Sequence, residues 1–199
     1  MSSRKEGKLF ILSGPSGSGK STILRAVLEQ VPEAYFSVSM TTRGPRPNEV
    51  AGEDYLYVEE EVFLKTLDEG GLLESNYHFG NWYGTPRAPI EARLSLGGDV
   101  LLDIEVEGAA QVKGKMPQAV TIFLFPPSIE VLEQRLRARG TDSEEKIQIR
   151  LKRACEEYER ALFYDYLVIN DTIEEAIAEV LAIIKAEHCK LEARRHLII

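Results

Sequence analysis

Eight consecutive residues, 14–21, read Gly-Pro-Ser-Gly-Ser-Gly-Lys-Ser. Their spacing, Gly, four residues, then Gly-Lys-Ser, is that of a phosphate-binding loop, whose glycines let backbone N–H groups converge on an anion without Cβ clashes. In such a loop Lys20 reaches the β- and γ-phosphates, and the Ser21 hydroxyl can bind Mg²⁺. The loop predicts binding of a nucleoside triphosphate. GTPases, motor ATPases and small-molecule kinases share it, so the rest of the chain must decide the reaction.

The residues on either side of the loop supply the elements that it needs. Residues 9–12, Leu-Phe-Ile-Leu, are continuously apolar and predict a buried strand, and residues 22–28 predict a helix. A helix that begins directly after the loop adds unpaired N–H groups and the positive end of its dipole to the anion site. Strand, glycine loop and helix in this order are the context in which the motif binds phosphate.

Short apolar runs recur along the chain and predict a parallel sheet that is covered on both faces. The expected strands are 9–12, 100–104, 120–125 and 167–169. The helices expected from the spacing of apolar residues are 129–139, 144–163 and 173–194. Capping boxes, from Thr141 to Glu144 and from Thr172 to Glu175, precede the last two helices. Strands that alternate with helices indicate an α/β fold with a central parallel sheet flanked by helices.

Residues 37–89 interrupt this alternation. They hold many polar residues, glycines, prolines and tyrosines, with one expected helix at 62–68 and an extended piece at 72–77. We interpret this segment as a small lobe inserted into the core.

A second interruption, residues 128–153, is rich in arginine and contains Gly140 at a helix break. This composition predicts a mobile flap that carries positive charge. At 199 residues the chain suits a single domain. The remaining residues, 1–36, 90–127 and 154–199, are expected to form its core.

The composition argues against several classes of function. The chain has 32 acidic and 24 basic side chains and a net charge of −8, which does not suit an extended nucleic-acid surface. A mononucleotide site needs only a few local cations, so a nucleotide ligand remains compatible. No apolar run approaches the ~18 residues of a membrane span. Cys155 and Cys189 form no metal or redox pattern, so we expect free thiols and a cytoplasmic protein without nucleic-acid or membrane partners.

Two arginines, Arg43 and Arg46, stand three residues apart beside hydroxyl side chains and a proline. They can form a fork for a second phosphate, because guanidinium groups bind phosphate oxygens through paired N–H groups. The spacing alone fits a solvated surface loop equally well.

Tyr55, Glu74 and the run Gly-Asn-Trp-Tyr-Gly-Thr at 80–85 form another candidate group. Tyrosine hydroxyls can bind phosphate oxygens. A carboxylate can accept from both the N1–H and the exocyclic amine that guanine offers on one edge, whereas adenine offers only its amine. Composition alone leaves Trp82 and Tyr83 as ordinary packing residues.

Two further groups carry charge that suits phosphate chemistry. Asp103 ends an expected strand, where a carboxylate of phosphate-loop enzymes holds Mg²⁺ through water, although aspartate at a strand end is also a common turn residue. Arg135 and Arg139 lie four apart on one helix face, and Arg150 follows. These arginines can stabilise a transferring phosphoryl group, or they can pair with neighbouring glutamates on a solvated face.

All these groups occur together, in this order, in one known family, and the chain closely resembles guanylate kinase. The matching stretches are GPSGSGKST, FSVSMTTRGPRPNE, GEDYLY, LLESNYHFGNWYGTP, LLDIEVEGA, FPPS, RLRARGTDSEEKIQIRL and YDYLVIND. They extend from Leu9 to Asp171, nearly the whole chain. The resemblance implies a P-loop kinase fold with an inserted GMP-binding lobe at 37–89 and a helical lid at 128–153. It implies the reaction ATP + GMP → ADP + GDP, with Mg²⁺ accompanying ATP and homo-oligomerisation left open.

The resemblance also assigns roles to residues. On the ATP side it implies Gly14, Pro15, Ser16, Gly17, Ser18, Gly19, Lys20, Ser21, Thr22, Arg135, Asn170 and Asp171. On the GMP side it implies Ser39, Arg43, Arg46, Tyr55, Glu74, Tyr83, Thr85 and Glu105. The groups implied to act on the transferring phosphoryl are Lys20, Arg43, Arg139, Arg150 and Asp103. Those implied to bind Mg²⁺, partly through water, are Ser21 and Asp103.

One motif departs from a common family form, Asp-Ile-Asp-x-Gln-Gly, because residues 103–108 here read Asp-Ile-Glu-Val-Glu-Gly. Glu105 keeps the charge with one more methylene, which weakens the inference of a guanine contact relative to Glu74. The residues alone give no reason for Glu107.

Three other functions are possible for a chain with such motifs. A guanylate-kinase-like module that only binds proteins would lack an intact phosphate loop, and this loop is intact. A related kinase with a sugar-phosphate acceptor would have no use for base-reading groups such as Glu74 and Thr85. A GTPase would carry a guanine-specificity motif such as Asn-Lys-x-Asp, which is absent.

Overall fold

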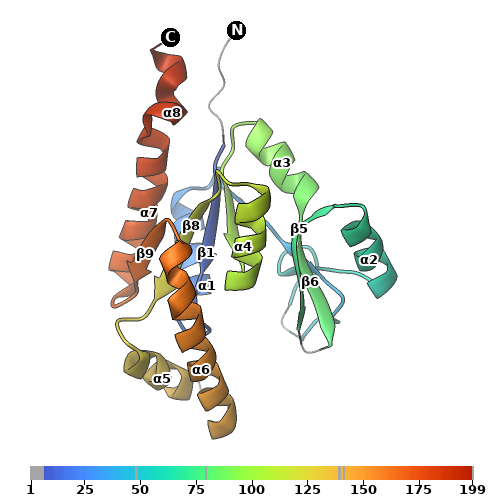
Figure 1. Cartoon of the computed structure of the whole chain (residues 1–199), viewed down its shortest axis with the longest axis vertical. Helices are drawn as coiled ribbons and strands as arrows, with labels where there is room; N and C mark the ends of the chain where they lie inside the picture. Colours follow the sequence, from blue (N-terminus) through green and yellow to red (C-terminus); the bar gives the residue numbers. More distant parts are fainter. Residues whose placement is uncertain (1–6, 48, 79, 139, 141, 199) are drawn as a thin grey trace.

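The computed structural model describes residues 7–47, 49–78, 80–138, 140 and 142–198. Within this part of the chain the core is a five-stranded sheet whose neighbouring strands all run parallel (Figure 1). In order across the sheet the strands are β2 (Tyr35–Phe36), β7 (Val100–Asp103), β1 (Leu9–Ser13), β8 (Val120–Phe125) and β9 (Tyr166–Ile169). Every residue of β1 and β8 is buried, which explains why both strands are apolar apart from Ser13 and Thr121.

Helices cover both faces of this sheet. They are α1 (Lys20–Gln30) and α7 (Ile173–Cys189) on one face, and α3 (Arg87–Ser95) and α4 (Val106–Lys115) on the other. Alternate residues of β1 show the division: Phe10 and Leu12 pack with α1 and α7, whereas Leu9 and Ile11 pack with α3 and α4. The predicted α/β architecture with a central parallel sheet is confirmed.

The carboxyl ends of the strands bring distant segments to one edge of the sheet. Leu12 lies opposite Asp103, so the glycine loop after β1 begins beside the acidic residue that ends β7. Phe125, at the end of β8, lies opposite Ile169, and Asn170 follows directly. The parallel strands thus bring the glycine loop, the Asp103 carboxylate and the Asn170 amide to the same edge of the sheet.

A second sheet lies beside the core, entirely within residues 37–89 (Figure 1). In order its strands are β4 (Tyr55–Tyr57), β3 (Ser39–Thr41), β6 (Asn81–Pro86) and β5 (Leu72–His78). Strand β6 runs antiparallel to both of its neighbours. Helix α2 (Glu60–Asp68) contributes the fully buried Phe63, whose ring stacks on Trp82. This contact gives the second sheet an apolar base of its own.

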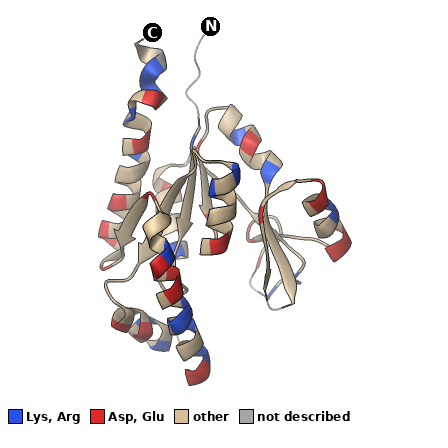
Figure 2. Ribbon diagram, viewed as in Figure 1, with Lys and Arg blue, Asp and Glu red and all other residues tan. Residues whose placement is uncertain are grey.

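Two helices project from the loop edge of the core, away from both chain termini (Figure 1). They are α5 (Ile129–Ala138) and α6 (Glu144–Arg160). Leu132 and Leu136 of α5 pack against Ile147 and Leu151 of α6 in a separate hydrophobic cluster. Helix α6 carries charged residues of both signs along its length (Figure 2).

Several helix boundaries differ from the prediction. Helix α6 is capped by Ser143, whose Oγ accepts from the backbone N–H of Lys146, and Thr141 lies outside the described residues. The α-helix ends at Arg160 and tightens into a 3₁₀ turn, Ala161–Phe163, rather than continuing to Phe163. The expected cap at Thr172 is confirmed, since its Oγ1 accepts from the N–H of Glu175.

The expected helix 173–194 is interrupted. Helix α7 ends at Cys189, because Lys190 adopts an extended conformation with ψ 142°. A short helix α8 (Leu191–Arg194) and a 3₁₀ turn (Arg195–Leu197) follow. Cys155 and Cys189 are exposed free thiols. Across the described ranges, no helix combines the length and the apolar character that crossing a membrane requires.

Candidate functional site

The glycine loop adopts the backbone shape that its sequence predicts. Gly14, Gly17 and Gly19 have φ values of +147°, +98° and +95°. A Cβ at Gly14 would lie 2.0 Å from the carbonyl oxygen of Leu124, and one at Gly19 would lie 2.4 Å from the side-chain nitrogen of Asn170. Side chains are therefore excluded at both positions by close packing as well as by conformation.

Helix α1 begins directly at the end of this loop with an N-terminus suited to an anion. Gly19 is its capping residue, no side chain caps it, and its first turn contains no acidic residue. The Lys20 ammonium folds back over the loop and donates to the carbonyl oxygens of Gly14 at 2.6 Å and Pro15 at 3.4 Å. Unpaired N–H groups, the helix dipole and this ammonium all favour a bound phosphate.

Beside the loop lies a cavity of about 490 Å³, here called the loop cavity. Its lining comprises Gly14, Pro15, Ser16, Lys20, Tyr55, Asp103, Ile104, Glu105, Ile149, Arg150, Arg153, Ala154 and Glu157. The glycine loop, the end of β7 and helix α6 thus form three of its walls.

A second cavity of about 300 Å³, here called the sheet cavity, opens against the second sheet. Its lining comprises Ser39, Arg46, Tyr55, Glu74, Asn76, His78, Tyr83, Asp103, Ile104 and Glu105. Tyr55, Asp103, Ile104 and Glu105 line both cavities. The two spaces therefore share a wall, and a group bound in one can face a group bound in the other.

Glu74 is a buried carboxylate on the floor of the sheet cavity, with 5% of its surface exposed. The hydroxyl of Thr85 donates to its Oε1 at 2.6 Å. Its other oxygen, Oε2, packs so close to Gly108 that a Cβ there would lie 2.9 Å away. Burial raises the pKa of Glu74, and the hydrogen bond from Thr85 opposes this rise.

Asp103 stands at the shared wall, between Lys20 and Glu105. Burial is the main cause that raises the pKa of Asp103, the positive charge of Lys20 lowers it, and the negative charge of Glu105 raises it further. A cation bound nearby would stabilise the ionised carboxylate.

The two arginines of the expected phosphate fork are placed differently. Arg46 lines the sheet cavity. Arg43 is not among the lining residues, because its guanidinium is bound by both carboxylate oxygens of Glu49, at 2.9 and 2.8 Å. The Arg43 guanidinium, with the backbone N–H of Arg46, lowers the pKa of Glu49 to about 2. Glu49 raises the pKa of Arg43 through its hydrogen bonds, and the nearby Tyr83 raises it further.

The expected lid residues contact the loop edge where they are described. Nη1 of Arg150 donates to the hydroxyl of Ser16 at 2.5 Å. Nη2 of Arg135 donates to the carbonyl oxygens of Asn170 and Asp171, at 2.9 and 3.4 Å. The side-chain amide of Asn170 donates in turn to the carbonyl oxygen of Ser18 at 2.7 Å. Arg139 lies outside the described residues.

Comparison with known proteins agrees with this arrangement. A family model described as guanylate kinase matches residues 6–187. The chain belongs to the guanylate kinase family. The guanylate kinase of Thermus thermophilus is 52% identical over 181 residues, which cover 91% of this chain and 82% of the relative. That of Oceanobacillus iheyensis is 48% identical over 189 residues, 95% of this chain and 92% of the relative.

A solved structure of the same family gives the same result. The crystal structure of guanylate kinase from Anaplasma phagocytophilum is 35% identical in sequence, with a TM-score of 0.76 over 94% of this chain and 89% of that one. The resemblance to the guanylate kinase family and the P-loop kinase fold are confirmed.

Sequence reasoning assigned no role to several polar residues that the structure brings to this site. Among them are Glu49, His78, Arg153 and Glu157. Glu49 stands three residues after Arg46 in a stretch that the family shares, which was an available signal. Glu157 follows Arg153 by one helical turn, a spacing typical of surface ion pairs, and nothing in the sequence showed that Glu157 is 7% exposed beside Lys20.

Proposed function

We propose that this chain transfers the γ-phosphoryl group of ATP to GMP, with ATP in the loop cavity and GMP in the sheet cavity. Family membership supports the reaction. The observation that carries the assignment of the two cavities is their common wall of Tyr55, Asp103, Ile104 and Glu105. Two substrates on either side of this wall can meet without an intermediate on the protein.

On the ATP side, the backbone N–H groups of the glycine loop and the start of α1 bind the phosphates. Lys20 turns from its own loop carbonyls toward the β- and γ-phosphates. Arg150 moves from Ser16 onto the same phosphates, and Arg139 joins it by family resemblance. Arg135 supports the segment of Asn170 and Asp171 beside the adenine.

On the GMP side, Arg46, Ser39 and the two tyrosines bind the phosphate. Burial raises the pKa of Tyr55, which keeps its hydroxyl protonated and able to donate. Arg43 joins through its contact with Tyr83. Glu74, positioned by Thr85, reads the N1–H and amine of guanine, and Glu105 contributes from the shared wall.

The reaction needs no strong general base. A phosphate oxygen of GMP is already anionic, attacks the γ-phosphorus and forms the new P–O bond. The bond from the γ-phosphorus to the bridging oxygen breaks, and ADP leaves with its electron pair. His78 and His188, the histidines whose side chains are described, lie apart, on β5 and α7, and do not form a base. Positioning and charge neutralisation account for the catalysis.

The residues at the loop edge fit a magnesium ion that is held mainly by the nucleotide. Among the described residues, no group of three or more Asp, Glu, His or Cys side chains forms a metal site. Mg²⁺ with ATP typically keeps several waters and uses only one or two protein ligands. The Ser21 hydroxyl and the Asp103 carboxylate would hold it, the latter through water. When bound, the ion would neutralise charge on the β- and γ-phosphates.

We further propose that residues 37–89 form the GMP-binding lobe and residues 128–153 the lid, both of which close over the substrates and exclude water. The reducing environment that suits Cys155 and Cys189, and the supply of ATP and GMP, favour the cytoplasm. The net charge of −8 does not suit a nucleic-acid partner.

The reaction is tested by incubating the protein with ATP, Mg²⁺ and GMP and measuring both products. We expect ADP and GDP in equal amounts. Lys20→Ala should reduce turnover by at least ~10³-fold, because it removes the cation next to the transferring group. Its melting temperature should change little, because only two hydrogen bonds within the loop are lost. Near-normal turnover in this variant, or ADP without GDP, would contradict the proposal.

A further inference from the structure

Glu105 lines both cavities, and its own packing does not fix its carboxylate. Its backbone occupies the N-terminal cap position of α4, with φ −73° and ψ 164°. Its side chain is about half exposed, at 51%. A glutamate side chain has several rotatable bonds, so the position of this carboxylate depends on the groups that bind it.

Two side chains from different elements meet the same oxygen of Glu105. Nη2 of Arg153, in α6, donates to Oε2 at 2.7 Å. Nε2 of His78, the last residue of β5, lies 3.0 Å from that oxygen. This one carboxylate therefore connects the core with α6 and with the second sheet.

Arg153 is itself held in place. Its Nε donates at 2.9 Å to Oε1 of Glu157, one helical turn further along α6. Glu157 is buried, so this contact fixes the Nε end of the Arg153 guanidinium. Oε2 of Glu107 lies 3.9 Å from Nη2. Burial lowers the pKa of Arg153, and the charges of Glu105, Glu157 and Glu107 more than reverse this effect.

The same contacts explain the departure of residues 103–108 from the common family motif. An aspartate at position 105 would end about one C–C bond, ~1.5 Å, closer to the backbone than Glu105 does. The added methylene brings the carboxylate within hydrogen-bonding distance of Arg153. Glu107, whose carboxylate the sequence left unexplained, accepts from Arg160 at 2.8 Å. Both acidic departures are therefore paired with arginines of α6.

We propose that Arg153 is a positioning residue that fixes the Glu105 carboxylate for recognition of GMP. This proposal rests on the proposed function and deepens it. Helix α6 also places Arg150 against Ser16 of the glycine loop. The ion pair of Arg153 with Glu105 therefore connects the site proposed for GMP with the helix that approaches the site proposed for ATP.

Arg153 also lines the loop cavity, so a direct role as a phosphate ligand is the competing interpretation. Its contacts favour the positioning role. Its Nε and Nη2 are directed at carboxylates of Glu157 and Glu105, and Glu107 adds a third negative charge nearby. Arg150 directs Nη1 at a neutral hydroxyl, Ser16, while its Nη2 lies 3.4 Å from Oδ2 of Asp142. A phosphate could therefore bind Nη1 of Arg150 by displacing only a hydroxyl, whereas at Arg153 it would have to displace carboxylates from both Nε and Nη2.

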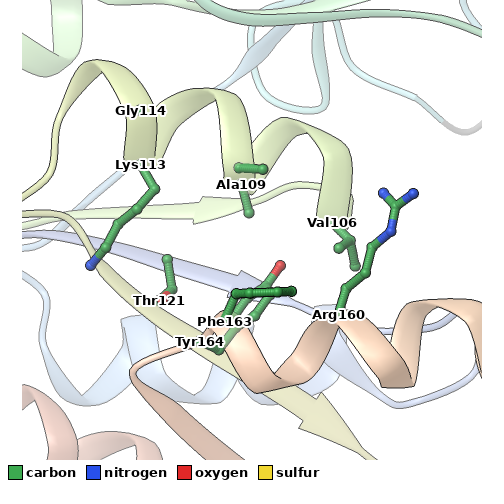
Figure 3. Close-up of a pocket in the computed structure, with 9 residues that line it drawn as sticks. Val106, Ala109, Lys113, Gly114, Thr121, Arg160, Phe163 and Tyr164 are labelled. Atoms are coloured by element: carbon green, nitrogen blue, oxygen red, sulfur yellow. The ribbon is translucent and has the colours of Figure 1, made fainter.

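The chain offers a matched control on the same helix. Arg160 has the same charge and also pairs with an acidic residue of the motif, Glu107. It lines neither the loop cavity nor the sheet cavity. It stands beside Val106 at a separate, largely apolar hollow of about 440 Å³ between α4 and the end of α6 (Figure 3), and it also borders a surface hollow that His78 and Arg153 line. Arg160→Gln therefore reproduces the loss of charge without touching Glu105.

The test is the affinity for GMP without ATP, measured by titration calorimetry on Arg153→Gln, Glu105→Gln, the double variant and Arg160→Gln. We expect Arg153→Gln to weaken GMP binding roughly 10-fold, within the range of coupling between residues of one ion-pair network. Glu105→Gln should have a similar effect, and the double variant should be no weaker than Glu105→Gln alone. Arg160→Gln should stay within about twofold of the unaltered protein.

Arg153→Lys covers the case in which Arg153→Gln fails to fold, which thermal melting would reveal. Lysine keeps the charge but cannot bind Glu105 and Glu157 in two directions, so we expect an intermediate loss of GMP affinity. The proposal is overturned if Arg153→Gln weakens GMP further in the Glu105→Gln background. It is also overturned if Arg160→Gln has an equal effect, or if KM for ATP rises while GMP affinity is unchanged.

Failure of the proposed function gives a different result. A protein that binds GMP but forms no GDP from ATP refutes the reaction, and the calorimetric comparison still tests Arg153. A protein that does not bind GMP at all refutes both.

Discussion

In the proposed function, the carboxylate of Glu74 serves recognition of GMP at the expense of the stability of the folded chain. It is buried at the floor of the sheet cavity with the Thr85 hydroxyl as its hydrogen-bond donor. Burial raises the pKa of Glu74, which means that its ionised form is less favourable in the folded chain than in water. The same ionised form is the one that can accept both donors of guanine.

Glu74→Gln should therefore raise the melting temperature of the ligand-free protein and weaken its selectivity for GMP over AMP. The sign follows from proton linkage. Between the ordinary value of 4.5 and the raised pKa, the folded state binds more protons than the unfolded state, so stability falls as the pH rises through this window. Glutamine does not ionise, so the variant avoids this loss of stability. The difference in melting temperature between Glu74→Gln and the unaltered protein should therefore grow as the pH rises from 5 toward 8.

Melting curves across this pH range and the GMP to AMP ratio of kcat/KM check both parts of this prediction. A variant that is less stable than the parent at pH 8, or one that keeps its selectivity, would show that Glu74 is not an ionised reader of guanine.

At the residue scale, the sequence predicted which side chains line the cavities more reliably than which charged side chains pair with each other. Glu74, Tyr83 and Asp103 could be proposed from motifs and family resemblance, and all three line a cavity. The contact of Arg43 with Glu49 could not be predicted, because a loop rich in charges permits several pairings of similar energy.

At the scale of elements, the turn after β3 is organised by Glu49. Its carboxylate binds Arg43, accepts from the backbone N–H of Arg46 at 2.8 Å and accepts from the hydroxyl of Tyr57 at 2.7 Å. One acidic side chain thus connects β4 with the segment that carries both arginines of the expected phosphate fork.

Glu49→Gln should raise KM for GMP about 10-fold, because Arg43 and Arg46 lose their common partner, with little effect on KM for ATP. Glu53→Gln, an exposed carboxylate of the same loop, is the control and should change neither value. The pKa of Glu49 is lowered to about 2, so its contribution is complete above 4.5 and is lost only as the pH falls toward 2. The effect should therefore be constant between pH 6 and pH 9. An unchanged KM for GMP, or an equal change in Glu53→Gln, would contradict this role.

Elements were predictable where burial imposes a pattern. All four core strands with apolar runs were expected. Those of β1, β7 and β8 are buried between covering helices, whereas in β9, at the edge of the sheet, only Val168 is buried. Helices α3 and α4 were not among the predicted helices. Pro89 lies in the first turn of α3, where proline is tolerated. In α4, Gly108 is needed where Glu74 packs against the helix.

For the molecule as a whole, the local charge in the two cavities matters more for substrate binding than the net charge of the chain. A chain with a net charge of −8 is proposed to bind two anionic substrates, because Lys20, Arg46 and Arg150 line its two cavities. The second sheet and the pair of helices α5 and α6 stand on different sides of the loop edge (Figure 1). The proposed closure would bring both toward the wall between the cavities.

The existence of two cavities that share a wall could not be predicted from the sequence. It depends on how β4 and β5 of the second sheet approach the end of β7, which involves Tyr55, Glu74 and Asp103 from three distant segments. Family resemblance implied the lobe, but the approach of its residues to Asp103 is visible only in the folded structure.

The most direct test of this account measures kcat/KM with ATP and each of GMP, AMP, CMP and UMP, through formation of ADP. A site that pairs Glu74 and Glu105 with the donors of guanine should favour GMP by at least ~10³-fold over each of the other three. Equal use of AMP, or no ADP formation with any of the four acceptors, would contradict it.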